Sequence, residues 1–167
     1  MLILKISQEI LLLVKSMRVQ TVVKKTAEKA VGSSRGGKNT KIHTLVDGLG
    51  NPLAFLLSSG NDHDSVHAIP LLEKVQISGS NILGDKAYGA QKIRDYISAQ
   101  NAVYTIPPKE NCTKPWSVDW HTYKERHLVE CFFQKIKWFR RISTRYDKTD
   151  ASFLAFVYLA SISILLK

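Results

Sequence analysis

Cysteine is scarce in this chain of 167 residues, which contains only Cys112 and Cys131. The two lie far apart and lack the C-x-x-C spacing of a zinc ribbon. They also do not make the disulfide framework that is typical of small secreted proteins. The cysteine content therefore favours a reducing compartment, the cytoplasm. No internal repeat is evident, and the length is that of one domain with a substantial core.

Long hydrophobic runs are also lacking. The run ASFLAFVYLASISILL has 16 residues without a charge, whereas a helix needs about 20 to span a bilayer. We therefore expect a buried terminal helix and no membrane anchor. The start, MLILKISQEILLLVKSM, has no basic beginning, no unbroken apolar core and no small-residue cleavage site, so it is not interpreted as a signal peptide.

Acidic residues are few, with 14 Asp and Glu against 24 Lys and Arg, and the net charge is +10. Such an excess points to a polyanion such as nucleic acid, or less strongly to an anionic membrane surface. Residues 15–41 and 124–148 each hold eight of the basic residues. A solvated charged face is the alternative, but the second group is interleaved with aromatic residues, which favours nucleic acid: Tyr123, Trp138, Phe139 and Tyr146.

Strand and helix patterns alternate along the chain. Residues 1–14 are compatible with a strand or a short helix, and residues 15–40 are expected to form a basic loop or arm. The segment KIHTLVDGLGNPLAFLLSSG predicts a hairpin, because two apolar runs flank a turn sequence. Further elements are predicted by capping and periodicity: helices over 64–75, 90–99, 121–140 and 150–166, and strands in SNILGD and AVYTIPP. This order predicts an α/β fold in which helices pack on a mixed sheet.

The glycine-rich segment GSSRGGKNT resembles a phosphate-binding loop of the form G-x-x-x-x-G-K-[ST]. Asn39 stands where Ser or Thr is needed, and the segment leads into a hairpin, whereas such a loop must open a helix. We therefore do not expect a nucleotide site. Arg35, Lys38 and Lys41 are candidate contacts to DNA phosphates, and a plain flexible turn is the alternative.

Two carboxylates could hold a divalent ion such as Mg²⁺. Glu130 is the one acid in a row of cations on the polar side of the helix in YKERHLVECFFQKIKWFRR, although ordinary i,i+4 ion pairs would explain the same pattern. Asp85 follows a short buried strand, at the sheet edge where ligands bind in α/β folds; it could also simply begin the turn DKAYG. The segment HDSVH, with His63 and His67, approximates a zinc-protease helix, but it has no obvious third ligand.

The spacing Tyr123-x2-Arg126-x3-Glu130-x6-Lys137 resembles the Y-x2-R-x3-E-x6-K signature of bacterial insertion-sequence DDE transposases with an IS4-like nuclease domain. The similarity covers roughly residues 30–160 and includes, in order, SRGGKNTKIHTLVDGLGNPLAFLL, NDHDS, ILGDKAY, IPP, YKERHLVE and RRISTRYDK. This resemblance implies a ribonuclease-H-like mixed sheet with flanking helices. The first strand of that sheet is uncertain in this sequence. The implied function is DNA strand cleavage and transfer.

In that family three acids bind two Mg²⁺ (or Mn²⁺) ions. The resemblance implies that Asp85 is the second catalytic acid and metal ligand and Glu130 the third. It further implies contacts to the transposon-end DNA from Tyr123, Arg126, Lys137, Arg140 and Arg141. The implied partner is double-stranded DNA, both the terminal repeats of the insertion sequence and the target. The resemblance also implies that the active protein is a homo-oligomer. It would act in the bacterial nucleoid and would have no membrane partner.

The first acid of the family is missing. It normally lies in a strand ahead of the basic segment, within D-S-T, and the matching region here reads LLLVKSMRVQTVVKK, with no acid between Glu9 and Glu28. We interpret residues 1–29 as an N-terminal remnant or basic arm, and residues 30–167 as a partial catalytic domain of a truncated or frame-shifted transposase. Asp47 could substitute for the missing acid. The alternative function is that of a non-catalytic DNA-binding fragment that modulates the full-length enzyme.

Overall fold

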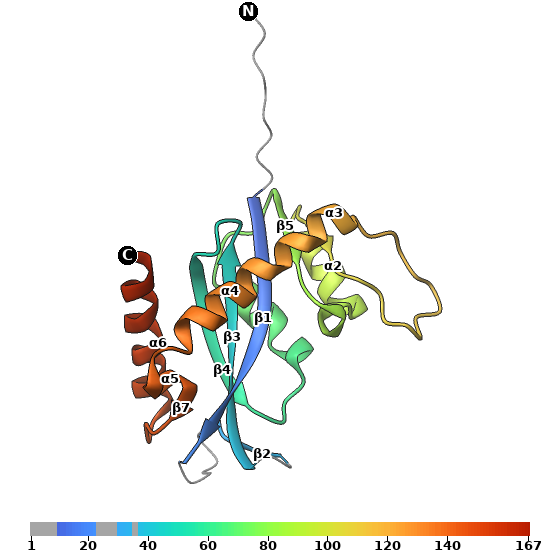
Figure 1. Cartoon of the computed structure of the whole chain (residues 1–167). Helices are drawn as coiled ribbons and strands as arrows, with labels where there is room; N and C mark the ends of the chain where they lie inside the picture. The colour runs from blue at the N-terminus through green and yellow to red at the C-terminus, as the bar shows by residue number, and fades with distance from the viewer. Residues whose placement is uncertain (1–9, 23–29, 35–36) are drawn as a thin grey trace, which may run out of the picture.

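One mixed sheet organises the protein (Figure 1). The computed structural model describes residues 10–22, 30–34 and 37–167, and within these ranges seven strands belong to a single sheet. The order is β2-β3-β1-β5-β6, with β4 added to β3 and β7 added to β1. The strand bounds are β1 Ile10–Thr21, β2 Gly32–Ser34, β3 Gly37–Asp47, β4 Pro52–Ser59, β5 Ser80–Leu83, β6 Val103–Thr105 and β7 Thr144–Arg145.

β1 has hydrogen-bonded neighbours on both edges. It runs antiparallel to β3 from Leu12 to Gln20 on one edge. On the other edge it runs parallel to β5 at its start and parallel to the short β7 at its end. β1 is therefore the central strand, and the other elements are arranged around it.

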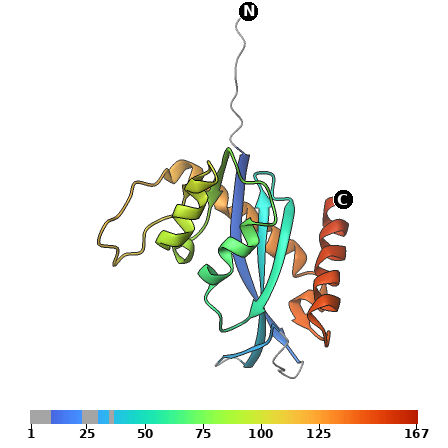
Figure 2. The same ribbon diagram turned by 180° about the vertical axis from the view of Figure 1, so that it is seen from behind.

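Helices cover both faces of the sheet, as the two opposite views show (Figures 1 and 2). α4, α5 and α6 pack on one face and share one hydrophobic core with it, while α1 and α2 pack on the other face and share a second core. The bounds are η1 Asp64–Val66, α1 Ala68–Leu72, η2 Lys86–Tyr88, α2 Gln91–Ala99, α3 Trp120–Tyr123, η3 Lys124–Arg126, α4 His127–Ile136, α5 Arg140–Ser143 and α6 Asp150–Leu165.

The alternation of side chains along β1 assigns its residues to the two cores. Leu13 and Met17 lie in the core under α4 and α6, whereas Leu12 and Val14 lie in the core under α1 and α2. Because successive side chains in a strand point to opposite faces, Lys15 shares the face of Leu13 and Met17. The sequence thus directs one lysine toward α4.

Several sequence predictions are confirmed. The predicted hairpin is β3 and β4, and its turn contains Gly50 at a φ of +83°, a conformation that glycine adopts without strain. The predicted helix over 90–99 is α2, the strand in AVYTIPP is β6, and the terminal helix is α6.

The expected basic loop over residues 15–40 is wrong for most of its described part. β1 continues to Thr21, β2 occupies residues 32–34, and β3 begins at Gly37. From Ser16 to Gln20 polar and apolar residues alternate, which is the period of a half-buried strand. The density of charge concealed this period in the sequence. Residues 10–21, assigned from the sequence to a remnant or arm, are thus part of the sheet.

Two predicted helices are divided. The segment 121–140 forms α3, the 3-10 turn η3 and α4, which ends at Ile136, and Phe139 is extended (ψ 106°) before α5 begins. The helix expected over 64–75 starts as the 3-10 turn η1 and becomes α-helical only from Ala68 to Leu72.

Arg145 anchors α6 to the sheet. Its side chain is fully buried, and its guanidinium donates to Asp150 Oδ1 (2.5 Å) and Thr40 Oγ1 (3.0 Å), while its Nε donates to the Asp147 carbonyl (3.2 Å). A buried charge is tolerated only when it is paired and hydrogen-bonded, and these contacts meet that requirement. They fix the start of α6 against β3 and β7.

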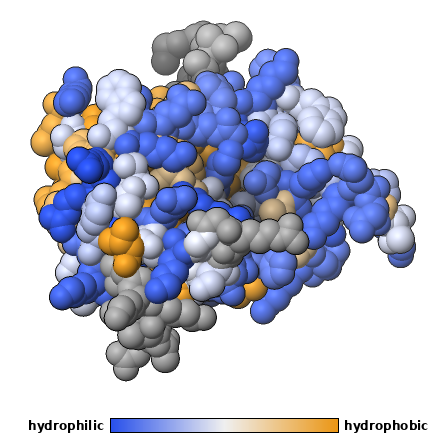
Figure 3. Space-filling model, turned by 60° about the horizontal axis from the view of Figure 1, so that its bottom comes forward, coloured by the Kyte–Doolittle hydropathy of each residue, from blue (hydrophilic) through white to orange (hydrophobic). Residues whose placement is uncertain are grey.

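The surface is mainly hydrophilic on the side shown in Figure 3, with hydrophobic side chains gathered at the left edge, where α6 lies. α6 is apolar around its whole circumference and exposes several large side chains: Tyr158, Leu159, Ile162 and Leu165. Among the described helices, none combines the length and apolar character that crossing a membrane requires.

A buried histidine joins β3 to β4. His43 Nε2 hydrogen-bonds with Ser58 Oγ (2.7 Å), and its ring centroid lies 4.8 Å from that of His67. Burial lowers the pKa of His43 to about 4, with the nearby His67 and Lys41 acting in the same direction and Asp64 and Asp62 opposing. His43 is therefore neutral in the folded protein at pH values where the unfolded chain already binds a proton.

This difference predicts an acid-labile fold. Because the folded pKa of His43 lies below its unfolded value of 6.5, the free energy of unfolding should fall as the pH drops from 6.5 to 4. The contribution of His43 to this loss should be about 3 kcal/mol. Urea unfolding at a series of pH values measures it. His43→Asn should flatten the curve over this range, whereas His121→Asn, at an exposed site, should not; equal slopes in wild type and His43→Asn would contradict the prediction.

Candidate functional site

A lysine of β1 and a glutamate of α4 meet over the face of the sheet. Lys15 Nζ donates to Glu130 Oε1 at 2.5 Å, and the two side chains are 26% and 38% exposed. The strand alternation directs Lys15 toward α4. In α4, Val129, Phe132 and Phe133 are buried in the core, which leaves Glu130 at the edge of the packed face. The contact therefore follows from packing of α4 on β1.

Arg126 reaches the same carboxylate from one helical turn earlier. Its Nη1 donates to Glu130 Oε1 at 2.6 Å, and its guanidinium lies 5.5 Å from the centroid of the Tyr123 ring. The hydrogen bond from Lys15 lowers the pKa of Glu130 and, with that from Arg126, outweighs the opposing effect of partial burial. Glu130 is thus held in the ionised form between two cations.

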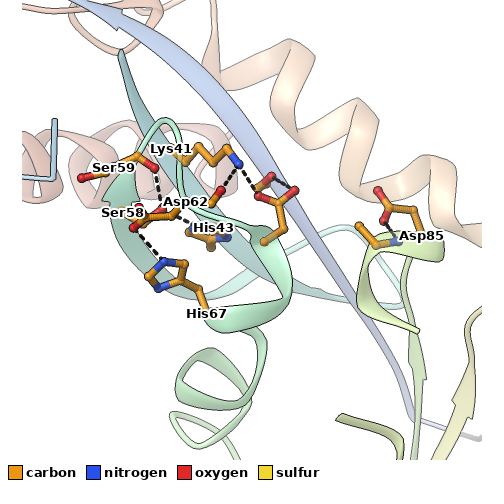
Figure 4. Close-up of polar contacts among 10 residues, drawn as sticks. Lys41, His43, Ser58, Ser59, Asp62, His67 and Asp85 are labelled. Atoms are coloured by element: carbon orange, nitrogen blue, oxygen red, sulfur yellow. Dashed lines mark hydrogen bonds and ion pairs between the residues drawn. The ribbon is translucent and has the colours of Figure 1, made fainter. Parts of the chain in front are cut away.

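Asp85 lies just beyond β5, on the strand next to β1. Leu13 of β1 is paired with Leu83 of β5 in the parallel ladder. Lys15 lies two residues after Leu13, and Asp85 lies two residues after Leu83. The Asp85 carboxylate caps η2, since Oδ1 accepts from the Ala87 backbone N–H at 2.8 Å (Figure 4). Partial burial acts to lower the pKa of the Arg126 guanidinium. The hydrogen bond with Glu130 and the charges of Tyr123, Glu130 and Asp85 outweigh burial, so the pKa is raised. Arg126 therefore experiences the field of both predicted catalytic acids.

The space beside the Lys15–Glu130 pair is an open groove of about 510 Å³. We call it the β1/α4 groove, because β1 forms one wall and α4 with the residue that follows it forms the other. The groove carries the cations Lys15, Arg18 and Lys137 and the single acid Glu130, and its remaining lining residues are Ser16, Met17, Phe133 and Gln134. Arg18 and Lys137 are exposed. A duplex backbone approaching this groove would meet an excess of positive charge.

Arg18 was not among the residues singled out from the sequence. It lay in the stretch expected to be a loop, and only the strand places it in the wall of the β1/α4 groove. The alternation of polar and apolar residues in SMRVQ was the signal that could have indicated it.

The other predicted DNA contacts are dispersed. Lys38 is exposed at the start of β3 and Arg140 is exposed on α5, while Arg35 lies outside the described residues. Arg141 pairs with Asp147 at 2.5 Å, and its guanidinium lies 3.6 Å from the centroid of the Phe156 ring. Among the predicted DNA contacts, Lys137 lines the β1/α4 groove together with Glu130. Arg140 and Arg141 lie on α5, which follows shortly after Lys137 in the chain.

Lys41 has internal partners. Its side chain is 7% exposed, and Nζ donates to the Asp62 carbonyl at 2.5 Å and to Asp64 Oδ1 at 2.7 Å (Figure 4). Ser16, on the other face of β1 from Lys15, donates to Asp64 Oδ2 at 2.8 Å. Partial burial would raise the pKa of Asp64, but the hydrogen bonds from Lys41 and Ser16 lower it below its usual value. Lys41 thus neutralises an acid inside the protein.

The alternative acids and ligands have other roles. Asp47 Oδ1 accepts from the backbone N–H groups of Leu49 and Asn51 at 2.9 Å each, and Oδ2 accepts from the Asn51 side chain at 3.0 Å, so both oxygens hold the β3–β4 turn. His63 precedes the 3-10 turn η1 and is not on an α-helix with His67, whose Nε2 lies 3.1 Å from Asp62 Oδ2. In the described part of the chain, no three His, Cys, Asp or Glu side chains gather in a group able to hold a metal ion.

Comparisons with known proteins assign the chain to a family. The family model described as "Transposase DDE domain" matches residues 15–165. The chain belongs to the DDE transposase family. A curated relative, the putative transposase for insertion sequence element IS6501 of Brucella ovis, is 40% identical over 130 residues, which are 77% of this chain and 98% of the relative.

A solved transposase shares the fold. The piggyBac transposase, in a cryo-EM structure of its synaptic complex with hairpin DNA, superposes with a TM-score of 0.58 at 9% identity, over 90% of this chain. This chain corresponds to 45% of the piggyBac chain. Mos1 transposase, in a pre-cleavage transpososome, gives a TM-score of 0.40 at 14% identity. The fold is the ribonuclease-H-like mixed sheet that the sequence resemblance implied.

The residues at the predicted acid site do not fit the metal chemistry of the family. DDE transposases depend on divalent metal ions, which are bound by carboxylates free to coordinate them. Here the Oε1 atom of Glu130 accepts from both Lys15 and Arg126. The two negative charges of Asp85 and Glu130 are balanced by the two positive charges of Lys15 and Arg126. We therefore derive no metal-dependent step for this chain as it stands.

The Lys15–Glu130 pair should contribute measurably to stability. In a double-mutant cycle of Lys15→Met and Glu130→Gln, we expect a coupling energy of about 1 kcal/mol, because the pair is partly shielded from solvent and is screened less than a surface pair. Urea unfolding measures each variant. The Lys86–Glu110 pair has a similar separation, 2.7 Å, but is exposed, and should show no measurable coupling; an equally small coupling at Lys15–Glu130 would contradict the prediction.

Proposed function

We propose that the protein acts in DNA transposition by binding insertion-sequence DNA in the β1/α4 groove. The observation that supports this proposal is the groove itself, which Lys15, Arg18 and Lys137 line together with the acid Glu130 of the transposase signature. Phosphate neutralisation by lysine and arginine supplies most of the affinity of proteins for DNA. The likeness to a putative insertion-sequence transposase supports the same assignment.

The bound DNA is proposed to be the terminal repeat of the chain's own insertion sequence. Tyr123 and Arg126 lie where α3 and η3 lead into α4, next to Glu130, and Lys38, Arg140 and Arg141 extend the basic surface beyond the groove. In an active assembly the chain would act as a homo-oligomer in the nucleoid, with terminal repeats and target DNA as partners. Lys41, whose ammonium group binds Asp64, supports the wall of β1 from inside.

DNA binding and DNA cleavage are separated in this chain. The family reaction needs a divalent ion, Mg²⁺ or Mn²⁺, held by acids, and Glu130 is occupied by Lys15 and Arg126. We therefore propose a transposase domain that binds DNA ends without cutting them. This favours the second candidate function, in which the protein modulates a full-length transposase by occupying its binding sites.

Removing the groove cations should weaken DNA binding. Arg18→Ala/Lys137→Ala should lower the affinity for a terminal-repeat duplex about tenfold and reduce the slope of log K against log salt by about 2, because two phosphate contacts are lost. Fluorescence anisotropy in EDTA at several KCl concentrations measures both quantities.

Lys74→Ala/Lys92→Ala is the matched control, because it removes two exposed cations of the α1/α2 face. This variant has the same net charge as the groove variant and should bind nearly as well as wild type. Equal losses in the two variants would show that general charge, and not the β1/α4 groove, binds the DNA.

The isolated wild-type chain should not cleave DNA. Incubation of the purified protein with a labelled terminal-repeat duplex and Mg²⁺ or Mn²⁺ should yield no nicked product above the level of a metal-free reaction. Glu130→Ala should bind the duplex about as well as wild type. Metal-dependent cleavage that disappears in Glu130→Ala would overturn the proposal that the chain only binds.

A further inference from the structure

Lys15 occupies a position that the geometry relates to both acids of the site. Its ammonium lies 2.5 Å from Glu130 Oε1. Leu13 of β1 and Leu83 of β5 are paired in the parallel ladder. Lys15 lies two residues after Leu13, and Asp85 lies two residues after Leu83, so the two occupy corresponding positions. β1, the end of β5 and α4 therefore bring Lys15, Asp85 and Glu130 to one edge of the sheet.

The local sequence agrees with this placement. The acid that the family carries ahead of its basic segment stands before a serine in D-S-T, and Lys15 stands before Ser16 in V-K-S-M. Ser16 points to the opposite face, where it donates to Asp64. The strand is thus continuous through this position, and Lys15 stands where that motif has its acid.

The charges show what Lys15 does there. Glu130 and Asp85 carry two negative charges, and Lys15 and Arg126 supply two positive charges close to them. A divalent ion approaching Glu130 would be repelled by both cations and could reach Oε1 only by displacing the lysine ammonium. The site is electrically balanced without any ion from solution.

We infer that the Lys15 ammonium group takes the place of a divalent cation at Glu130, and that Lys15→Asp converts the ion pair into a site for Mg²⁺ or Mn²⁺. This inference rests on the proposed function, because that proposal identifies Glu130 as the family acid. The ligands of the converted site are the new carboxylate at position 15, Asp85 and Glu130. Arg126 remains and balances part of their charge.

The difference in side-chain length makes room for the ion. Aspartate ends its chain at Cγ, whereas the lysine chain continues through Cδ and Cε to Nζ. The new carboxylate would therefore stop short of Glu130 and leave a gap. A magnesium ion lies about 2.1 Å from each ligand oxygen and can bridge two carboxylates across such a gap. The open β1/α4 groove beside the pair gives the ion and its remaining water ligands access from solvent.

Binding of Mn²⁺ to the full-length chain, measured by electron paramagnetic resonance without DNA, tests the inference. Lys15→Asp should bind Mn²⁺ at least tenfold more tightly than wild type, and Mg²⁺ should compete. Lys15→Asp/Glu130→Gln should lose this gain. Lys15→Asn removes the ammonium without adding an acid and should bind far more weakly than Lys15→Asp.

Several results would overturn the inference. A folded Lys15→Asp protein, verified by circular dichroism, that binds Mn²⁺ no better than wild type would show that position 15 does not face the site. Lys15→Asn binding as tightly as Lys15→Asp would show that the residue at position 15 is not a ligand.

Wild type supplies a test that does not depend on the folding of a variant at position 15. Its weak Mn²⁺ binding should be unchanged by Glu130→Gln, and a loss in that variant would show that the ammonium does not exclude the metal. The metal titrations contain no DNA and the anisotropy measurements contain no metal. Failure of the groove proposal and failure of this inference are therefore distinguishable.

Discussion

The pairing of β1 along both edges is the constraint on which the rest of the structure depends. On one edge it binds β3 over nine residues, and on the other it binds β5 near its start and β7 near its end. A central strand with both edges satisfied cannot slip by one residue, because every side chain would then exchange cores. The register of β1 therefore fixes which residues face α4 and which face η1 and α1.

Both ionic contacts beside the site follow from that register. On one face Lys15 meets Glu130, and on the other Ser16 meets Asp64, whose second oxygen binds Lys41. Successive residues of one strand thus join α4 to the sheet and η1 to the sheet. Arg18 and Lys137 both line the β1/α4 groove, so the proposed DNA surface and the balanced acid site share the same two walls.

The sequence was sufficient for the elements that carry local signals. The turn DGLGNP predicted the hairpin, the uncharged apolar run near the C-terminus predicted α6, and the short run SNILGD predicted the strand before Asp85. β1 could not be predicted in the same way, because its partners β5 and β7 are distant in the chain and its charges resembled those of a loop. The Lys15–Glu130 contact spans 115 positions and has no local signal. The prediction of an acid site came from the signature around Glu130, whereas the counter-charge at position 15 required the fold.

An internal ammonium group also differs from a metal ion in how it is supplied. An ion must be captured from solution, so the occupancy of its site depends on its concentration and on competing chelators. A lysine attached to the central strand is present at a fixed and very high effective concentration. The region around Glu130 therefore keeps its charge balance whatever the metal content of its surroundings, and the contact of α4 with β1 does not depend on a captured ion.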